Sequence, residues 1–153
     1  MFAFVVSGSE EANIVTNVDH QVPHGETREL IKGVAAGRAH GAFQGKIIVR
    51  EHAQKVDAHQ LSRNVILGGR AVIDTKPELE IYADDVKCSH GASVGELDEA
   101  VLFYLRSRGI PDTEARHMLV EGFLCEPVEE IADPSVRDYL LRRLSRRLEG
   151  LEA

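Results

Sequence analysis

The amino-acid sequence predicts a mainly β protein that ends in an α-helical appendage. Short β-prone runs bounded by turn residues fill the first part of the chain, and a helical hydrophobic period begins after Gly95. No low-complexity linker separates the two parts. Strands without intervening helices are typical of a sandwich, a barrel or a β-solenoid, and composition alone does not choose among these. We therefore divide the chain into a β region (1–94) and a helical region (95–153).

The predicted strands are short and regularly bounded by glycine, asparagine or aspartate. Gly68 and Gly69 predict a tight hairpin or a corner turn. Residues 26–37 could pass for a helical turn, although the two glycines in that segment weaken this interpretation. The β-prone runs cover residues 2–6, 13–18, 45–50, 64–67, 70–73, 78–83 and 86–90.

Two helices are predicted between Gly95 and Pro127. The first ends at Gly109, which suits a left-handed C-cap, and the second begins near Asp112 and ends at Pro127. The spacing of apolar residues predicts which side chains the first helix buries. These are Leu97, Ala100, Val101, Tyr104 and Leu105.

A third helix has Asp133 as its N-cap and Pro134 at its first position. Its apolar stripe is wider than such a small appendage needs, and arginines occupy the other sides of the helix. We interpret the stripe as a partner-binding surface, with packing on the β region as the alternative. The stripe comprises Val136, Leu140, Leu144 and Leu148.

Composition excludes several classes of protein. The 153 residues are 43% hydrophobic and 28% charged, which suits a folded domain and not a disordered chain. A net charge of −7 without a long basic run argues against nucleic acid as a partner. Cys88 and Cys125 are too few for a disulfide framework, and no apolar stretch approaches the roughly 20 residues of a membrane span. We expect a cytoplasmic protein with no membrane partner.

The segment Cys88-Ser89-His90 is the strongest candidate site. Residues two apart on a strand share a face, so the thiol and the imidazole should point the same way. Such a pair could bind iron, zinc or copper(I), or the imidazole could lower the thiol pKa and make it nucleophilic. The structural alternative is a small buried cysteine beside a histidine bonded to the backbone.

Several segments resemble the SufB/SufD family, and in particular the C-terminal portion of its SufD side. The resemblance covers about residues 13–125 and is most specific over 74–92, which reads DTKPELEIYADDVKCSHGA. It extends to 24–34 (HGETRELIKGV), 41–47 (GAFQGKI), 53–60 (AQKVDAHQ) and 103–110 (FYLRSRGI).

The resemblance implies a partial right-handed parallel β-helix followed by a helical domain. It also implies a scaffold subunit of a SUF-type iron–sulfur cluster assembly complex, without turnover of its own, that docks to a SufB-like subunit and a SufC-like ABC ATPase. Its cargo would be iron or a nascent cluster at a subunit interface. A reduced flavin could belong to the full complex. Because this chain is short relative to the family, we do not expect it to bind flavin.

In the family, the Cys-Ser-His segment lies at the subunit junction, which carries over to His90 and, less directly, to Cys88. These two residues form an incomplete metal site that a partner would complete. Two other functions stay open: a small metal-dependent enzyme that uses Cys88 and His90, and a truncated interaction module without cluster chemistry. Exposed strand edges and apolar side chains such as Phe4 and Val6 in the first turn also predict a homodimer or larger assembly.

Overall fold

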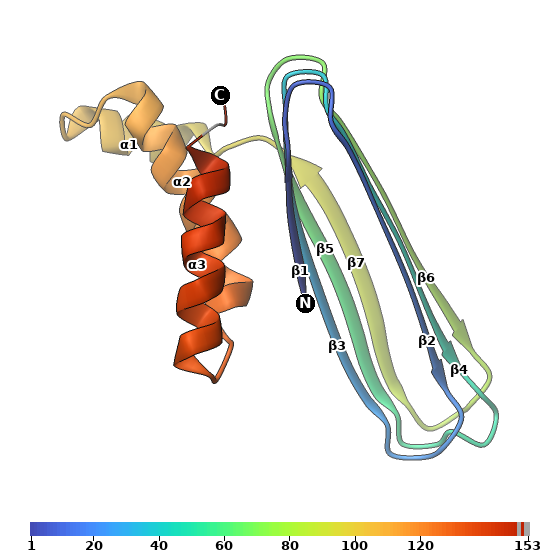
Figure 1. Cartoon of the computed structure of the whole chain (residues 1–153). Coiled ribbons are helices and arrows are strands. Elements are labelled where there is room, and N and C mark those ends of the chain that lie inside the picture. Colours follow the sequence, from blue (N-terminus) through green and yellow to red (C-terminus); the bar gives the residue numbers. More distant parts are fainter. Residues whose placement is uncertain (150, 152–153) are drawn as a thin grey trace.

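The computed structural model describes residues 1–149 and 151 of the chain. Within these residues, seven strands precede three helices, and the strands lie in the first part of the sequence (Figure 1). The strands are β1 (Phe2–Val6), β2 (Glu11–His20), β3 (Glu26–Ala36), β4 (His40–Val49), β5 (Asp57–Leu67), β6 (Val72–Ile81) and β7 (Lys87–Gly95).

The strands form a parallel β-solenoid, as expected. Odd-numbered strands make one sheet in the order β1-β3-β5-β7, and even-numbered strands make a second sheet in the order β2-β4-β6. Every pairing is parallel, so each strand stacks in register on the strand two places earlier in the chain. The chain completes three turns, β1–β2, β3–β4 and β5–β6, before β7 begins the next one (Figure 1).

Side chains of both sheets meet inside the solenoid. Near the helical end, Phe4, Ile31 and Phe43 belong to one buried apolar cluster, and near the far end Ile47 and Ala58 belong to a second. Polar residues of β5 are buried along the same strand. They are Gln60, Ser62 and Asn64.

Several strand predictions need correction. Residues 26–37 are not helical, because β3 covers 26–36 and stacks between β1 and β5. Gly68 and Gly69 form the corner turn, which was one of the two forms predicted for them, and their φ values of +66° and +72° explain the need for glycine. Phe4 and Val6 are buried, at 9% and 5% exposed, because both point into the first turn.

The three helices are α1 (Glu99–Ser107), α2 (Asp112–Glu129) and α3 (Pro134–Leu148). Asp98 caps α1 by accepting hydrogen bonds from two backbone N–H groups, and Asp133 caps α3 in the same way. Gly109 has a φ of +87°, as its predicted C-cap role requires. The predicted helical region continues to residue 153, and positions 150, 152 and 153 lie outside the described residues.

The predicted face of α1 is wrong for three of its five residues, since Leu97 and Leu105 are half-buried but Ala100, Val101 and Tyr104 are exposed. The helix buries Leu102, at 1% exposed, whereas Val101 and Tyr104 are 39% and 54% exposed. The reason is that α1 packs mainly against α2 and projects away from the solenoid, so only a narrow strip of it is covered (Figure 1).

The second helix continues two residues beyond Pro127, to Glu129, although the sequence predicted its end at that proline. Proline has no N–H to donate to the carbonyl four residues earlier, which belongs to Phe123. The Nζ atom of Lys32 donates to that carbonyl at 2.8 Å instead. Lys32 lies on β3, is 1% exposed and also pairs with Glu126. A buried lysine of the solenoid thus supplies the hydrogen bond that Pro127 cannot.

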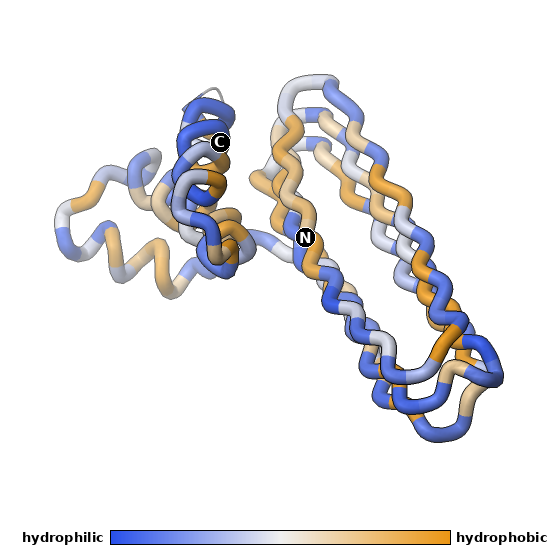
Figure 2. Tube along the Cα trace, turned by 60° about the horizontal axis from the view of Figure 1, so that its bottom comes forward, coloured by the Kyte–Doolittle hydropathy of each residue, from blue (hydrophilic) through white to orange (hydrophobic). Residues whose placement is uncertain are grey.

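The helices and the solenoid share an apolar core. It joins the outer face of β3 and β5 to α2 and the end of α3. The turns at the solenoid end distant from the helices are largely hydrophilic (Figure 2). The buried members are Val34, Ala36, Val65, Leu67, Val120, Leu124 and Leu148.

Candidate functional site at the last turn of the solenoid

Cys88 and His90 both point toward the inside of the solenoid. In the parallel register, Cys88 pairs with Ala58 and His90 pairs with Gln60. Both partners are buried interior residues of β5. The two candidate ligands therefore share one face of β7, as their spacing predicted.

This interior face is open because β7 is the edge strand of its sheet. Cys88 is half-buried and packs against the far apolar cluster of the solenoid. His90 is exposed. The pair thus lies where a strand or side chain of another subunit could contact it directly.

The environment of Cys88 raises the pKa of its thiol above the ordinary value. Burial is the main cause, the Asp57 carboxylate adds to it, and a hydrogen bond with the backbone of Ala58 acts in the opposite direction. The pKa shift is thus opposite to the one that would activate a nucleophile. Cys88 resembles a packed thiol more than a reactive one in the isolated chain.

The donor set at this position consists of one thiol and one imidazole. Among the described residues, no three His, Cys, Asp or Glu side chains come together in a way that could hold a metal ion. Stable iron or zinc sites use about four ligands. Cys88 and His90 are therefore an incomplete donor set within the described part of the chain.

A second polar group, which was not predicted from the sequence, lies on the outer face of the same strands. His59 Nε2 is 2.9 Å from Asp57 Oδ1, and His59 Nδ1 is 2.5 Å from Ser89 Oγ. Arg28 also pairs with Asp57, at 2.8 Å. The signal was present in the two-residue period, which places Ser89 on the face opposite Cys88 and His90.

The predicted partner-binding stripe of α3 is divided between two environments. Leu148 is 1% exposed in the core shared with β3 and β5, and Leu144 packs against the same core. Leu140 is half-buried, and Val136 is 44% exposed. The stripe therefore runs from the core to an accessible end near the start of the helix.

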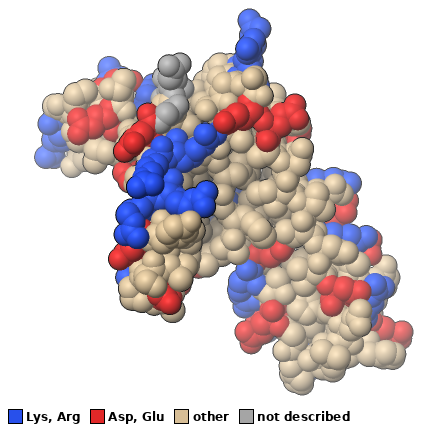
Figure 3. Space-filling model, viewed as in Figure 1, with Lys and Arg blue, Asp and Glu red and all other residues tan. Residues whose placement is uncertain are grey.

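Positive charge covers the exposed side of α3. Figure 3 shows Lys and Arg side chains gathered over this helix, in a protein whose formal net charge is −7. Asp138 is the one acidic residue in the helix, and its arginines are Arg137, Arg142, Arg143, Arg146 and Arg147.

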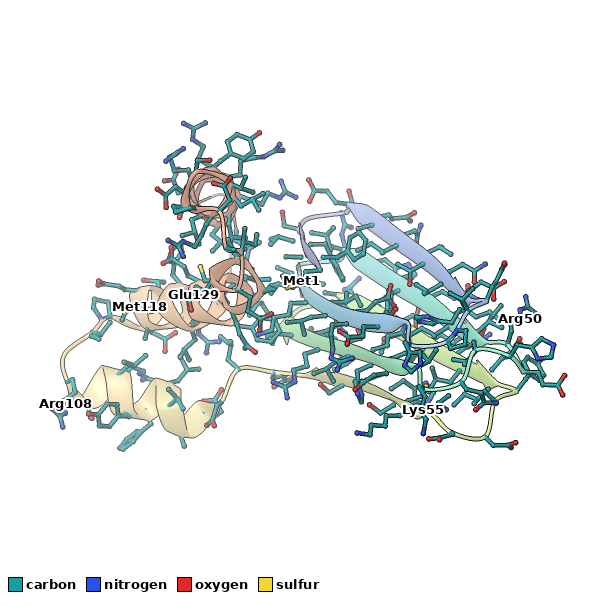
Figure 4. The ribbon with its side chains drawn as sticks, turned by 90° about the horizontal axis from the view of Figure 1, so that it is seen from below. Met1, Arg50, Lys55, Arg108, Met118 and Glu129 are labelled. Carbon is teal, nitrogen blue, oxygen red and sulfur yellow. The ribbon has the colours of Figure 1, made fainter. Side chains whose placement is uncertain are left out.

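An apolar groove of about 410 Å³ lies between α3, the end of α2 and β1. Leu140 and Leu144 line one side, and Met1 and Phe2 line another. Figure 4 shows Met1 near the end of α2, whereas Arg50 and Lys55 mark the opposite end of the solenoid. The groove continues the accessible part of the stripe.

Comparison with known proteins gives a consistent match for this architecture. Residues 2–123 match the family model described as SUF system FeS cluster assembly, SufBD core domain. Within the described residues, no helix is long and apolar enough to cross a membrane.

Three curated relatives illustrate the similarity. The iron-sulfur cluster assembly protein SufD of Escherichia coli (strain K12) is 40% identical over 142 residues, which cover 93% of this chain and 34% of the relative. An iron-sulfur cluster assembly SufBD family protein of Synechocystis is 40% identical over 143 residues, or 94% and 32% of the two chains. SufD of Bacillus subtilis (strain 168) is 36% identical over 141 residues, or 92% and 32%. The chain thus spans about a third of the length of these relatives.

Proposed function

Because this chain belongs to the SufBD family of the SUF iron–sulfur cluster assembly system, we propose that it acts as a SufD-like scaffold subunit without turnover of its own. In this proposal it docks to a SufB-like subunit through the solenoid and to a SufC-like ABC ATPase through the helices. The observation that carries the proposal is the position of His90, exposed on the interior face of an edge strand.

The open edge of β7 supports a subunit junction at this position. Strand β6, at the edge of the other sheet, contains Pro77, which has no N–H to offer a neighbouring strand. Strand β7 has nine residues and no proline. A strand of a SufB-like partner could therefore extend the β7 sheet and bring its own side chains beside Cys88 and His90.

The chemistry of the site then follows from what each residue can supply. The imidazole of His90 can present a nitrogen lone pair to iron at the junction, and a deprotonated Cys88 can present a thiolate. The raised pKa of Cys88 disfavours that thiolate in the isolated chain. The SufB-like partner would supply the missing ligands, and the iron or nascent cluster is cargo that passes through this position. Cys88 and Cys125 are both unpaired cysteines, which suits the cytoplasm as the compartment.

The proposed ATPase-docking surface is the accessible end of the α3 stripe with its arginine rim. Val136 and Leu140 would supply apolar contacts, and the apolar groove beside β1 would accept a side chain of the ATPase. The arginines would pair with acidic groups at the rim and speed association.

Iron binding tests the proposal that this chain and a SufB-like subunit each supply part of the iron ligands. We expect the isolated chain to bind ferrous iron weakly and the complex with a SufB-like subunit and a SufC-like ATPase to retain it. Anaerobic equilibrium dialysis of both preparations measures the difference, with His90→Ala in the complex as the matched variant. Tight stoichiometric iron in the isolated chain, together with turnover of a substrate, would favour a small metal-dependent enzyme instead. Normal partner binding with no loss of iron in His90→Ala would favour an interaction module.

A further inference from the structure

The interior of the solenoid contains a polar side chain whose hydrogen bonding is half complete. Gln60 is 1% exposed, and its Nε2 donates to Glu29 Oε2 at 2.5 Å. Its Oε1 is buried and has no hydrogen-bond partner. A buried carbonyl without a donor is destabilising, so a nearby donor would be favoured strongly.

Strand register pairs Gln60 with a residue of β7 that can donate a hydrogen bond. Glu29 on β3 pairs with Gln60 on β5, and Gln60 pairs with His90 on β7. Neighbouring strands are about 4.8 Å apart, so inward side chains at paired positions stack as a ladder. The imidazole of His90 is therefore the next group in line after the Gln60 amide.

The orientation of the Gln60 amide is fixed from the opposite side. An ionised carboxylate only accepts hydrogen bonds, so the amide must turn its NH₂ group toward Glu29. Thr16 donates to the same Glu29 oxygen at 3.3 Å and helps to hold that carboxylate. Gly45 leaves the required space, because a Cβ there would lie 2.3 Å from Gln60 Nε2. With the nitrogen committed to β3, the amide oxygen is left for the β7 side.

We infer that Gln60 is a positioning residue for His90: its Oε1, which has no partner in this structure, accepts a hydrogen bond from one imidazole N–H when the exposed ring turns toward it, and so fixes the tautomer and orientation of the ring. The other ring nitrogen then faces the open edge of the solenoid with its lone pair available to a metal. A hydrogen bond to the second nitrogen is the usual means by which proteins orient a histidine ligand. The functional meaning of this contact rests on the proposed role of His90 in iron handling, but the contact itself does not.

The tautomer of His90 tests the contact in the isolated chain. Long-range ¹H–¹⁵N spectra of histidine-labelled protein at about pH 8, where unperturbed imidazole is neutral, report the tautomer ratio, and His90→Ala assigns the signal. We expect one tautomer to dominate in the unmodified protein. The ratio of this tautomer to the other should fall about threefold to tenfold in Gln60→Leu, as the loss of one hydrogen bond predicts. A free-imidazole mixture in the unmodified protein, or an unchanged ratio in Gln60→Leu, would overturn the inference.

Two further variants separate positioning from packing. The exchange Glu29→Gln/Gln60→Glu keeps the net charge and reverses the hydrogen bond between positions 29 and 60, but position 60 can still accept from His90. It should therefore preserve the dominant tautomer, and it replaces Gln60→Leu as the test if that variant does not fold. Ser62→Ala removes a buried hydroxyl from the same face of β5, but the register partner of Ser62 is Ala92, so His90 should not respond. Loss of the tautomer preference in the folded exchange variant, or a response to Ser62→Ala as large as that to Gln60→Leu, would contradict the inference.

Cluster formation in the assembled complex distinguishes this inference from the proposed function. Gln60→Leu should slow cluster formation about threefold to tenfold, in parallel with its effect on the tautomer. If Gln60→Leu changes the tautomer while His90→Ala leaves cluster yield intact, the positioning contact stands and the proposed function fails. If His90→Ala abolishes the cluster and Gln60→Leu alters neither property, the positioning inference fails alone.

Discussion

At the scale of single residues, Lys32 shows how a residue buried against expectation can hold two parts of the molecule together. Its ammonium group bonds the Phe123 carbonyl, pairs with Glu126 and lies 4.4 Å from the centre of the Phe123 ring. These contacts connect β3 to the last turns of α2. They also satisfy the carbonyl that Pro127 leaves without its helical partner.

Replacing Lys32 should therefore weaken the fold in a way that depends on Pro127. Lys32→Met keeps the length of the side chain but removes the donor, and we expect a loss of about 2–3 kcal/mol in the free energy of unfolding. Pro127→Ala restores a backbone N–H, so it should recover about 1 kcal/mol in the Lys32→Met background and much less in the unmodified protein. Urea unfolding of the four proteins measures this coupling.

Lys55→Met is the matched control, because its pair with Asp85 is exposed and should contribute less than about 0.5 kcal/mol. Equal effects of Pro127→Ala in the unmodified protein and in Lys32→Met would refute the claim that Lys32 replaces the missing N–H of Pro127.

The loss of stability caused by Lys32→Met should also depend on pH. The hydrogen bond from Lys32 holds the pKa of Glu126 below its ordinary value of 4.5. The stabilisation from this pair is thus present above that value and is lost as the pH falls through the lowered pKa.

At the scale of elements, α3 combines an inner half that packs on the solenoid with an outer half that remains accessible. This division makes Val136 the sharpest probe of ATPase docking, because it is exposed and Leu148 is not. Val136→Asp should weaken binding of a SufC-like ATPase about fivefold or more while the fold survives. Titration calorimetry with the ATPase measures the change.

The control for this docking experiment is Val72→Asp, which changes an equally exposed valine on β6, outside the helices. It should leave ATPase affinity unchanged. Unaltered affinity in Val136→Asp would remove α3 from the docking surface and leave its stripe as a means of packing.

Elements were predictable from the sequence where local rules decide them. The capping residues Asp133 and Gly109 and the change of period near Gly95 located the helices. Local rules failed where distant residues intervene: Lys32, 95 positions before Pro127 in the chain, lets α2 pass its proline. They also failed for the face of α1, because the sequence does not tell which side another helix covers.

The candidate site was predictable only in part, for a similar reason. The two-residue period placed Cys88 and His90 on one face, but it did not tell which face is interior or that β7 lies at an edge. Glu29 and Gln60 could not be predicted as neighbours of His90, because nothing local in the sequence relates them to it. Only the register of the three stacked strands brings these positions together.

At the scale of the whole molecule, the solenoid offers unpaired strand edges, and we expect the isolated chain to associate with itself. The interior-facing Val94 of β7 is 41% exposed, which makes that edge the expected contact. Sedimentation at micromolar concentration should show a dimer or larger species, and Val94→Lys should shift it toward the monomer. Val15→Lys, on the outer side of β2, is the control and should leave the association unchanged. A monomeric unmodified protein would refute the prediction.

The division of the chain between residues 94 and 95 stays a prediction, since one apolar core joins both parts.

The central claim is that His90 handles iron at a junction between this chain and a SufB-like subunit. The most direct measurement is the absorbance of the cluster formed anaerobically in the reconstituted complex carrying His90→Ala. His59→Ala provides the comparison, because it removes a histidine from the outer face of the neighbouring strand. We expect cluster yield to fall at least about tenfold in His90→Ala, as loss of a ligand predicts, and to persist in His59→Ala. Undiminished cluster yield in His90→Ala, with the complex intact, would contradict the account.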